Sequence, residues 1–398
     1  MEGSVLIITE VFNPEEFLIN DIAQKWVEEG KQVSVLTRNP AYPYGKIYSG
    51  HKNSFYSKRV ENGMIVHRYH IIQNYRDNKI YKILNYVWNT VLATTLAITL
   101  FRKSKNIFIY HTGPLTVALP GVLLKKLNRG KVVIWTQDIW PDVVFAFGLR
   151  KNRLTVWFME MFVNFIYTNC NKVITTSRQV QKDIQKRVNT PPFFIPNWPM
   201  KAFQNKEEEI KISTDCKFTF TFAGNIGVMQ NLNTIVMAFH QWSMERQDVQ
   251  LFIYGDGSAQ GELTEILQRN AIKNVVLKGR VPVEEIPAIY KASDVLLISL
   301  RNDEVLEKYV PAKFSTYLTS GKPIFGILSG AVMEYIQEYK LGYVVEPEKI
   351  EELAKGFSYF VQMSQTERAK IRERALLLYK LEFDAEVNLS KLTQIVFH

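Results

Sequence analysis

The stretch FTFTFAGNIGVMQNL, residues Phe218–Leu232, decides the fold. Phenylalanine alternates with threonine over its first five residues, which is typical of a buried β-strand, and the strand runs into the turn Gly224-Asn225-Ile226-Gly227. From about Asn231 onward apolar residues recur at helical spacing, so we expect a helix to begin just past the turn. The stretch therefore predicts a strand, a glycine turn and a helix in direct succession.

A unit of this kind can bind an anion. Backbone N–H groups of the turn and of the helix N-terminus are expected to point at one place, where the helix dipole adds partial positive charge, and a phosphate group suits such a place. The alternative is a tight turn that binds nothing. Gly-x-x-Gly is a weak motif, so the loop by itself leaves both interpretations open.

The second half of the chain repeats this pattern. Further buried strands are expected at Val249–Tyr254, Val275–Gly279, Asp294–Leu300 and Pro323–Leu328, and a helix over Pro311–Ser320. The loops after these strands contain glycine, arginine or acidic residues. In an open parallel sheet the carboxyl ends of the strands line the ligand crevice, so we expect the binding groups at one edge.

The first half has the same rhythm. Its expected strands are Val5–Ile8, Val33–Thr37, Met64–Tyr69, Asn106–Tyr110, Lys131–Thr136 and Val173–Thr176, with a first helix over Phe17–Glu29. No glycine lies between Val5 and that helix, so the dinucleotide fingerprint of dehydrogenases is missing. The loop Arg38–Asn53 is either a connector or a substrate-facing loop.

Two polar residues that follow strands are candidates for a site. His111 follows one strand and Asp138 the next, so both are expected at the carboxyl edge of the sheet. A lone histidine is more often structural than functional. Asp138 is alternatively an N-cap for the helix after it.

The chain has 398 residues, which is long for one hydrophobic core. We expect an α/β protein of two doubly wound Rossmann-like domains that face each other across a cleft. Residues 1–198 form the first domain, the Lys- and Glu-rich stretch 199–215 a linker, and residues 216–380 the second domain. Residues 381–398 are expected to form a helix that packs back on the first domain.

The positive charge is unevenly placed. Residues 1–197 hold 26 Lys and Arg against 13 Asp and Glu, a net charge of +13, whereas the remainder has a net charge of −3. This asymmetry points to an anionic partner of the first half, either nucleic acid or an acidic membrane surface. The apolar segments at 76–105 and 150–167 carry basic flanks, and they are either ordinary helices packed on a sheet or helices that lie on anionic lipid.

The cysteines and the N-terminus suggest the compartment. The chain has two cysteines, Cys170 and Cys216, which are too few for a tetrahedral metal set or a disulfide framework. The short apolar run Val5–Ile8 has no basic region before it and is too short for a signal peptide. We therefore expect a cytoplasmic protein.

Seven stretches in order resemble one family. They are TEVFNPEEFLINDIAQKWVEEGKQVSVLTRNPAYPYGK, IWTQDIWPD, FTFAGNIGVMQNL, YGDGS, LKGRVP, ASDVLLISL and VPAKFSTYLTSGKPI. The chain resembles, over essentially its whole length, a GT-B glycosyltransferase of the large retaining group called glycosyltransferase family 4. It is most similar to the bacterial branch that builds O-antigens, capsules and related polysaccharides.

The resemblance implies a donor site on the second domain, where a UDP-sugar binds without a metal. The implied donor-binding residues are Gly224, Asn225, Ile226, Gly227, Gln230, Gly255, Arg280, Val281, Lys313 and Thr316. The glycine turn would present amides to the diphosphate, and Lys313 would place a cation near the phosphates. Gly255 is expected to shape the pocket more than to touch the ligand.

The resemblance also implies an acceptor site on the first domain and a catalytic set. The implied acceptor-binding residues are Asn13, His111, Gln137 and Asp138, and the implied catalytic residues are Asp138, Lys313 and Glu307. Catalysis means stabilising the negative charge that grows on the leaving diphosphate. The family's usual proposal sends the acceptor's proton to the departing phosphate, so no dedicated base is needed, and Asp138 would orient an acceptor hydroxyl.

The sequence departs from the family pattern at one motif. Many members carry two glutamates separated by seven intervening residues, where this chain has Lys308 and Thr316. Glu307 lies one residue out of register and is a candidate substitute for the first glutamate. The second glutamate normally holds the ribose hydroxyls, so a ribose contact by Thr316 is open.

The resemblance implies a retaining transferase that moves an N-acetylhexosamine or a 6-deoxy-N-acetylhexosamine from UDP. The acceptor would be a polyprenyl-diphosphate-linked saccharide at the inner face of the cell membrane, which the basic first half would contact. Two alternatives remain: a nucleotide-sugar epimerase on the same fold and a catalytically inactive GT-B partner subunit. Nucleic-acid binding is disfavoured, because no helix-turn-helix, RRM or zinc signature is present.

Overall fold

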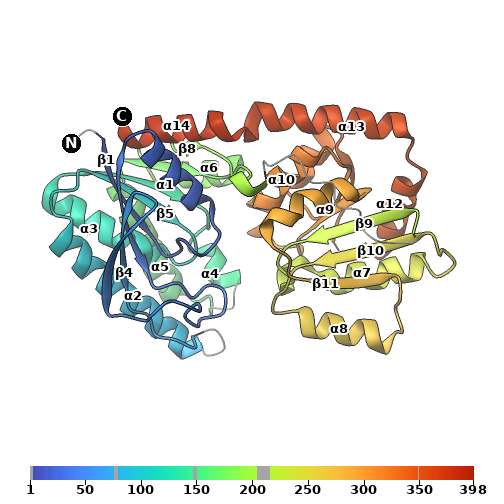
Figure 1. Ribbon diagram of the computed structural model, residues 1–398, viewed down its shortest axis with the longest axis horizontal. Helices are drawn as coiled ribbons and strands as arrows, with labels where there is room; N and C mark the ends of the chain where they lie inside the picture. Colours follow the sequence, from blue (N-terminus) through green and yellow to red (C-terminus); the bar gives the residue numbers. More distant parts are fainter. Residues whose placement is uncertain (1–2, 76–78, 147–149, 204–215, 348) are drawn as a thin grey trace. The chain divides into compact units, whose positions relative to one another are not determined.

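The computed structural model describes residues 3–75, 79–146, 150–203, 216–347 and 349–398 (Figure 1). The chain divides into two compact units, one of Met1–Pro196 with Glu386–His398 and one of Asn197–Ala385. Each unit contains one sheet. Most of the predicted linker, residues 204–215, lies outside the described residues.

The first unit is built on an eight-stranded sheet of order β3-β4-β2-β1-β5-β6-β7-β8. All its neighbours pair in parallel except β3 and β4, which are antiparallel. The strands are β1 (Ser4–Thr9), β2 (Gln32–Arg38), β3 (Tyr56–Glu61), β4 (Met64–Tyr69), β5 (Asn106–His111), β6 (Lys131–Thr136), β7 (Lys172–Thr175) and β8 (Phe193–Phe194). The strand order reverses between β1 and β5, and in sheets of this type that reversal marks the ligand crevice.

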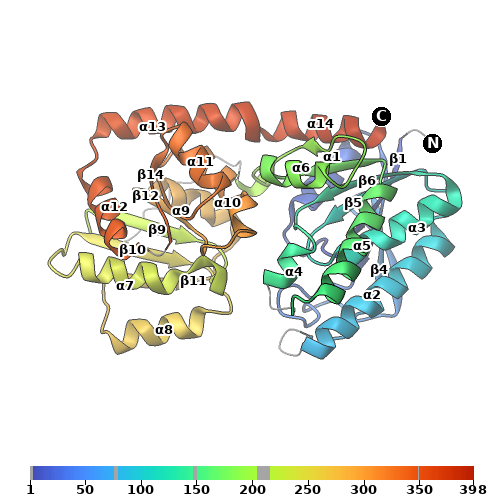
Figure 2. The same ribbon diagram turned by 180° about the vertical axis from the view of Figure 1, so that it is seen from behind.

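Helices pack on the faces of this sheet (Figures 1 and 2). They are α1 (Leu18–Glu28), α2 (Lys79–Leu100), α3 (Leu119–Asn128), α4 (Asp142–Ala146), α5 (Arg153–Asn169), α6 (Arg178–Gln185) and α14 (Ala385–Phe397). Trp26 of α1 is fully buried between Phe108 of β5 and Phe397 of α14, with ring centroids 5.4 and 5.3 Å away. Helix α3 contacts both α2 and α5.

The last helix is held by lysines. Lys131 Nζ and Lys172 Nζ donate to the Ile395 carbonyl over 3.0 and 3.2 Å, close to the C-terminus of α14. Cations stabilise a helix C-terminus because they complement its unpaired carbonyls and its dipole. The two ammonium groups lie close together, and burial followed by repulsion from Lys172 lowers the pKa of Lys131 to about 8.

The second unit is built on a six-stranded parallel sheet of order β11-β10-β9-β12-β13-β14. Its strands are β9 (Phe218–Ala223), β10 (Val249–Tyr254), β11 (Val275–Gly279), β12 (Val295–Ser299), β13 (Ile324–Ile327) and β14 (Gly342–Val345). Its helices are α7 (Leu232–Trp242), α8 (Gln260–Arg269), α9 (Ile286–Ala292), α10 (Ala312–Ser320), α11 (Ala331–Glu338), α12 (Ile350–Gln362) and α13 (Gln365–Leu378). Here the strand order reverses between β9 and β12.

The alternation of β9 explains the core of this unit. Phe220 and Phe222 belong to one core cluster, with Phe239 of α7 and Phe357 of α12. A second cluster on the other side contains Phe314 and other residues of α9, α10 and α11. The sheet is thus buried on both faces, as a doubly wound parallel sheet requires.

The two Rossmann-like α/β units confirm the predicted fold class, and every predicted strand is present within one or two residues. Three strands of the described residues were not predicted: β3, the two-residue β8 and β14. β3 follows the expected loop and forms a hairpin with β4 through Asn62-Gly63, a dipeptide that favours such turns. β14 is only four residues long.

Candidate active site

The candidate donor site lies at the carboxyl ends of β9 and β12, on either side of the point where the strand order reverses. Gly224 directly follows β9, and Lys313 lies in the first turn of α10, which follows β12 along the chain. Because β9 and β12 are neighbours, the sheet brings the two residues together. The sequence predicted both.

The glycine turn does not offer its amides as predicted. The N–H groups of Gly224 and Ile226 donate to the carbonyls of Tyr254 and Asp256 over 3.0 and 2.7 Å. The N–H of Gly227 donates to Gln230 Oε1 over 3.1 Å. Three of the four turn amides are therefore already paired, so the prediction of an open amide cradle is wrong for them.

The helix after the turn begins within one residue of the start predicted near Asn231. A 3-10 turn at Val228–Gln230 follows Gly227, and α7 begins at Leu232. Asn231 between them has a left-handed backbone, with φ of 49°. The strand, turn and helix are therefore not in direct succession, and the first turn of α7 does not open directly from the glycine turn.

Close approach of two loops explains Gly255. A Cβ placed on Gly255, whose φ is +127°, would lie 1.9 Å from the carbonyl oxygen of Gly224. Only glycine permits this contact. Gly255 thus shapes the turn, and its amide donates to the Gly279 carbonyl over 2.8 Å.

Lys313 is the group that this arrangement leaves without a partner. Its stem is partly exposed, but Nζ is sealed from solvent and has no hydrogen-bond partner among the described residues. Nζ lies 3.9 Å from the ring centroid of Phe222. A Cβ on Gly224, whose φ is +146°, would lie 2.7 Å from Nζ, so a side chain at Gly224 would fill the space that the amine occupies.

Burial of the amine has an electrostatic consequence. Desolvation lowers the pKa of Lys313 to about 7, because burial penalises the charged form and no carboxylate compensates. The face of the Phe222 ring offsets only part of that penalty. A buried cation without a counter-ion is a strong candidate for anion binding.

The remaining predicted donor residues are placed unequally. Arg280 is exposed after β11, and Val281 packs against the core. Thr316 is 5% exposed, and its hydroxyl donates to the Lys313 carbonyl over 2.8 Å and is also hydrogen-bonded by Tyr290. Since that hydroxyl is already engaged, the predicted ribose contact through Thr316 is not supported.

Two other predicted residues play supporting parts. Gln230 closes the glycine turn with its side chain, and its carbonyl accepts the Ser299 hydroxyl over 2.7 Å. Glu307 lies in a 3-10 turn at Leu306–Lys308, where its amide donates to the Asp303 carbonyl over 3.0 Å. Its catalytic role stays a prediction.

The candidate acceptor site lies at the carboxyl ends of β1, β5 and β6. Asp138 Oδ2 accepts the Gly113 N–H over 2.5 Å, so the carboxylate joins the loops after β5 and β6 and does not serve as the alternative helix cap. Burial raises the pKa of Asp138 to about 6, although the Gly113 bond opposes the shift. Gln137 is half-buried, and its backbone N–H donates to the His111 carbonyl over 2.9 Å.

His111 is a structural residue in this arrangement. Its ring is fully buried, with Nδ1 2.7 Å from Thr136 Oγ1 and Nε2 3.1 Å from the Gly113 carbonyl. Burial lowers its pKa to about 4. Both ring nitrogens are engaged, so the predicted acceptor contact by His111 is corrected to a role in holding the Gly113 loop.

Asn13 lies after β1 and is exposed. Its carbonyl accepts Arg68 Nη2 over 2.5 Å and its amide donates to Asn20 Oδ1 over 3.1 Å. These bonds fix the backbone and leave the side-chain role a prediction.

Sequence reasoning missed one residue at this edge. Glu10 directly follows β1, and its Oε2 would lie 3.6 Å from a Cβ on Gly113. Glu10 and Asp138 therefore flank the same glycine. A carboxylate at the end of a buried strand is the sequence signal that could have found it.

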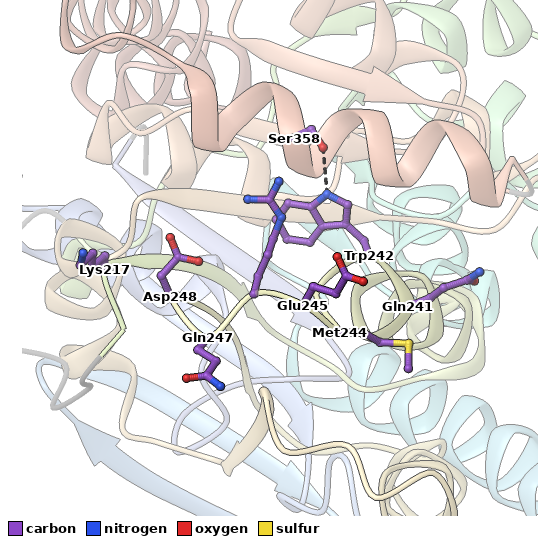
Figure 3. A pocket seen from close by; sticks show the side chains of 9 residues that line it. Lys217, Gln241, Trp242, Met244, Glu245, Gln247, Asp248 and Ser358 are labelled. Carbon is purple, nitrogen blue, oxygen red and sulfur yellow. Dashed lines mark hydrogen bonds between the residues drawn. The ribbon is translucent and has the colours of Figure 1, made fainter.

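A surface pocket lies elsewhere. Figure 3 shows it, lined by residues of the α7–β10 connection, by Lys217 before β9 and by Ser358 of α12. Trp242 Nε1 donates to Ser358 Oγ over 2.8 Å within it. These residues precede β9 and β10, so the pocket lies at the amino ends of the strands, opposite the glycine turn, and is not the candidate site.

The described part of the chain holds no group of three or more His, Cys, Asp or Glu side chains that could bind a metal ion.

Comparisons with known proteins find similarity over the part of the chain that contains the candidate donor site. Residues 203–377 match the family model described as Glycosyl transferases group 1. A protein of Pseudomonas aeruginosa named "Probable glycosyltransferase WbjE" is 23% identical over 257 residues, which are 61% of this chain. The match spans 62% of that relative's length.

Solved structures share the fold at low identity. A trehalose-6-phosphate protein from E. coli, solved with UDP-2-fluoro glucose, aligns with a TM-score of 0.73 at 11% identity over 99% of both chains. HepE of Anabaena, solved with UDP and glucose, aligns with a TM-score of 0.70 at 14% identity over 99% of both chains. Sucrose-phosphate synthase from Thermosynechococcus elongatus aligns with a TM-score of 0.70 at 13% identity, over 98% of this chain and 97% of that one. The chain therefore shares a GT-B-like fold with these structures, and residues 203–377 within it are similar to the glycosyl transferases group 1 model.

Proposed function

We propose that the chain is a retaining glycosyltransferase that moves a sugar from a UDP-sugar, an N-acetylhexosamine or a 6-deoxy-N-acetylhexosamine, to a polyprenyl-diphosphate-linked saccharide in bacterial surface polysaccharide synthesis. The group 1 domain and the relative named a probable glycosyltransferase support the transfer reaction. The UDP complexes of HepE support the donor. The observation that carries the proposal is the buried, unpaired amine of Lys313 beside Gly224.

The chemistry follows from that amine. The acceptor oxygen bonds to the anomeric carbon as the carbon–oxygen bond to the diphosphate breaks, and the electron pair leaves with the phosphate. The acceptor's proton passes to the departing phosphate oxygen. Lys313 turns from the face of Phe222 to the diphosphate, and its charge stabilises the leaving group as negative charge grows there. The reaction needs no metal in this proposal.

Thermal stabilisation tests the donor site. UDP, GDP, ADP and TDP are compared at equal concentration, since a ligand that binds only the folded state raises the melting temperature according to its affinity. We expect UDP to stabilise most. Lys313→Met should weaken UDP binding about 10–100-fold, because a charge-assisted contact is lost. No shift with any nucleotide would contradict the proposal and favour an inactive partner subunit.

A second part of the proposal concerns the membrane. Helix α2 is long and apolar enough to span a membrane over Ile80–Leu100, although 28% of its most apolar window is buried. Its polar face points inward: Asn85 and Asn89 are 1% and 3% exposed, and Asn85 Oδ1 accepts the Ile72 N–H over 2.9 Å. Its apolar stripe points outward, with exposed Ile80, Ile83, Leu84, Val87 and Val91.

Helix α5 repeats this arrangement. Leu154, Trp157, Phe158 and Met161 are exposed at spacings of three and four residues, so they form one stripe. Arg150, Lys151 and Arg153 are exposed at its N-terminal end. An apolar stripe with a basic rim suits an anionic lipid surface. We propose that these stripes hold the enzyme on the cytoplasmic face of the membrane, beside its lipid-linked acceptor.

Partitioning onto vesicles tests the membrane contact. Replacing Arg150, Lys151 and Arg153 by Ser should weaken binding to phosphatidylserine-containing vesicles by about 1 kcal/mol per charge at low salt. Trp157→Ser with Phe158→Ser should weaken binding to neutral vesicles as well. The matched control replaces three exposed lysines that belong to neither α2 nor α5, Lys340, Lys370 and Lys391, by Ser. Equal partitioning of all variants would contradict the membrane contact.

A further inference from the structure

Glu10 is a largely buried acidic residue to which the proposed reaction gives no role. It follows β1 at the position where the first sheet reverses its strand order, since β1 pairs with β2 on one side and with β5 on the other. The last paired residues there are Thr9 and Tyr110, so Glu10 lies level with the end of β5. This is the crevice position of a doubly wound sheet.

Glu10 is a largely buried residue. The residue is 9% exposed, and its carboxyl forms no hydrogen bond to the described part of the chain. Arg38 is the nearby cation, but its Nη2 pairs with Glu15 Oε1 at 3.5 Å instead. A structural carboxylate in this environment would be expected to take the guanidinium.

Glu15 shows what a structural carboxylate looks like here. Its Oε1 accepts the N–H groups of Ala41 and Tyr42 over 2.8 and 2.6 Å, and its Oε2 accepts the Phe12 N–H over 3.3 Å. Three amides and a guanidinium thus use the whole Glu15 carboxylate. Glu10, five residues earlier, uses none of these groups and is aimed at the Gly113 loop.

The groups around Glu10 come from every neighbouring element. Arg38 of β2 and Glu15 of the β1–α1 loop act on its charge. Three tyrosines interact with it electrostatically: Tyr69 of β4, Tyr75 of the segment before α2, and Tyr86 of α2. Asp138 accepts a hydrogen bond from the N–H of Gly113, the glycine near Glu10. Burial raises the pKa of Glu10 to about 7, Arg38 opposes the shift and Glu15 adds to it.

We propose that Glu10 is an acceptor-binding residue whose carboxylate accepts a hydrogen bond from a hydroxyl of the acceptor saccharide, beside the same Gly113 loop that Asp138 contacts. The inference rests on the proposed function, because it takes the acceptor to be a sugar. A ligand hydroxyl would donate the hydrogen bond that no group of the described chain donates to Glu10. That bond would offset the desolvation cost of the buried carboxylate. The position selects hydroxyl-bearing ligands over anionic ones, since a phosphate would meet two carboxylates.

Saturation-transfer NMR with methyl glycosides of N-acetylglucosamine and of galactose tests the inference, with UDP present and between pH 6.5 and 8. We expect wild-type protein to bind at least one glycoside, more tightly at pH 8 because the ionised carboxylate is the acceptor. Glu10→Gln should weaken that binding at least fivefold and flatten its pH dependence. Glu16→Gln, an exposed carboxylate on the same loop, is the matched control and should behave as wild type.

The outcomes distinguish a failure of the Glu10 inference from a failure of the proposed function. The inference would be overturned if Glu10→Gln bound the glycosides with the same affinity and the same pH dependence as wild type. It would also be overturned if wild type bound no glycoside. UDP binding, read in the same samples, should be unchanged in Glu10→Gln. Loss of UDP binding in wild type would instead refute the proposed donor. The melting temperature of Glu10→Gln should equal or exceed that of wild type, which excludes unfolding as the cause of weaker binding.

Discussion

The two sheets place opposite kinds of unpaired group at equivalent positions. Where the first sheet reverses its order, between β1 and β5, the group is the Glu10 carboxyl. Where the second sheet reverses its order, between β9 and β12, it is the Lys313 amine. Burial moves both pKa values to about 7 from opposite directions. In our proposal the missing partner of each group is a ligand: a hydroxyl donor in the first unit and an anion in the second.

The net charge of each half of the chain is opposite in sign to the charged groups at the point where its sheet reverses strand order. The first half of the chain has the net charge of +13, yet its crevice presents Glu10 and Asp138. The second half has a net charge of −3, yet its crevice presents Lys313. The basic surplus therefore belongs to the outer surface, where it suits a membrane, and the crevices follow local burial.

The largest loss of stability is expected on removal of Glu15, whose carboxylate accepts three backbone N–H groups and pairs with Arg38. Glu15→Ala removes the acceptor of three amides and leaves Arg38 buried and unpaired, so it should lower the free energy of unfolding by about 3–5 kcal/mol. Urea denaturation measures the change. Glu16→Ala is the exposed control and should change stability by less than about 0.5 kcal/mol. Similar values for both variants would remove the contrast between Glu15 and Glu10.

Gly224→Ala should affect both stability and the donor site. Its φ of +146° is unfavourable for alanine, and the added Cβ would meet Lys313 Nζ, so we expect a loss of about 1–3 kcal/mol together with weaker UDP binding. Gly261→Ala in α8 is the matched control, because a Cβ there meets open space. Calorimetric unfolding measures the stability of both variants, and UDP titration measures their affinity for the nucleotide. UDP binding of Gly224→Ala equal to wild type would show that Lys313 does not act through this contact.

The smallest effect has the opposite sign. The raised pKa of Glu10 means that the folded state binds its proton more tightly than the unfolded chain does, so its contribution to stability is present below pH 4.5 and is lost as the pH rises through about 7. Glu10→Gln removes this loss. We expect it to stabilise the protein by about 1–2 kcal/mol at pH 8 and by almost nothing at pH 4.5. A destabilised Glu10→Gln at pH 8 would assign Glu10 a structural role.

The sequence predicted the periodic parts of the fold and missed the parts set by long-range contacts. The alternation of Phe218–Ala223 and the apolar run Val249–Tyr254 gave β9 and β10 to the residue. The pairing of the Gly224 and Ile226 amides depends on the carbonyls that the next strand's loop supplies, which periodicity cannot show. β3 was missed although its turn residues, Asn62 and Gly63, favour a hairpin.

The candidate site was predicted in the same uneven way. Lys313 and Asp138 were found because resemblance and strand-end position pointed to them, and both are buried titratable groups in the structure. His111 had the same sequence signal as Asp138, but Thr136 and Gly113 take both its ring nitrogens. Glu10 could not be told from Glu15 or Glu16 by type. Only the folded chain shows which of the three carboxylates is left without a partner.

The most direct test of the account is proton uptake by the protein when UDP binds. Titration calorimetry at pH 8 in two buffers of different ionisation enthalpy measures it. With its pKa at about 7, free Lys313 is mostly neutral at pH 8, and the diphosphate would restore its charge, so we predict uptake of about 0.9 proton per UDP. Lys313→Met should bind more weakly and take up none. Tight UDP binding by wild type with no proton uptake would contradict the claim that the buried amine is the anion-binding group.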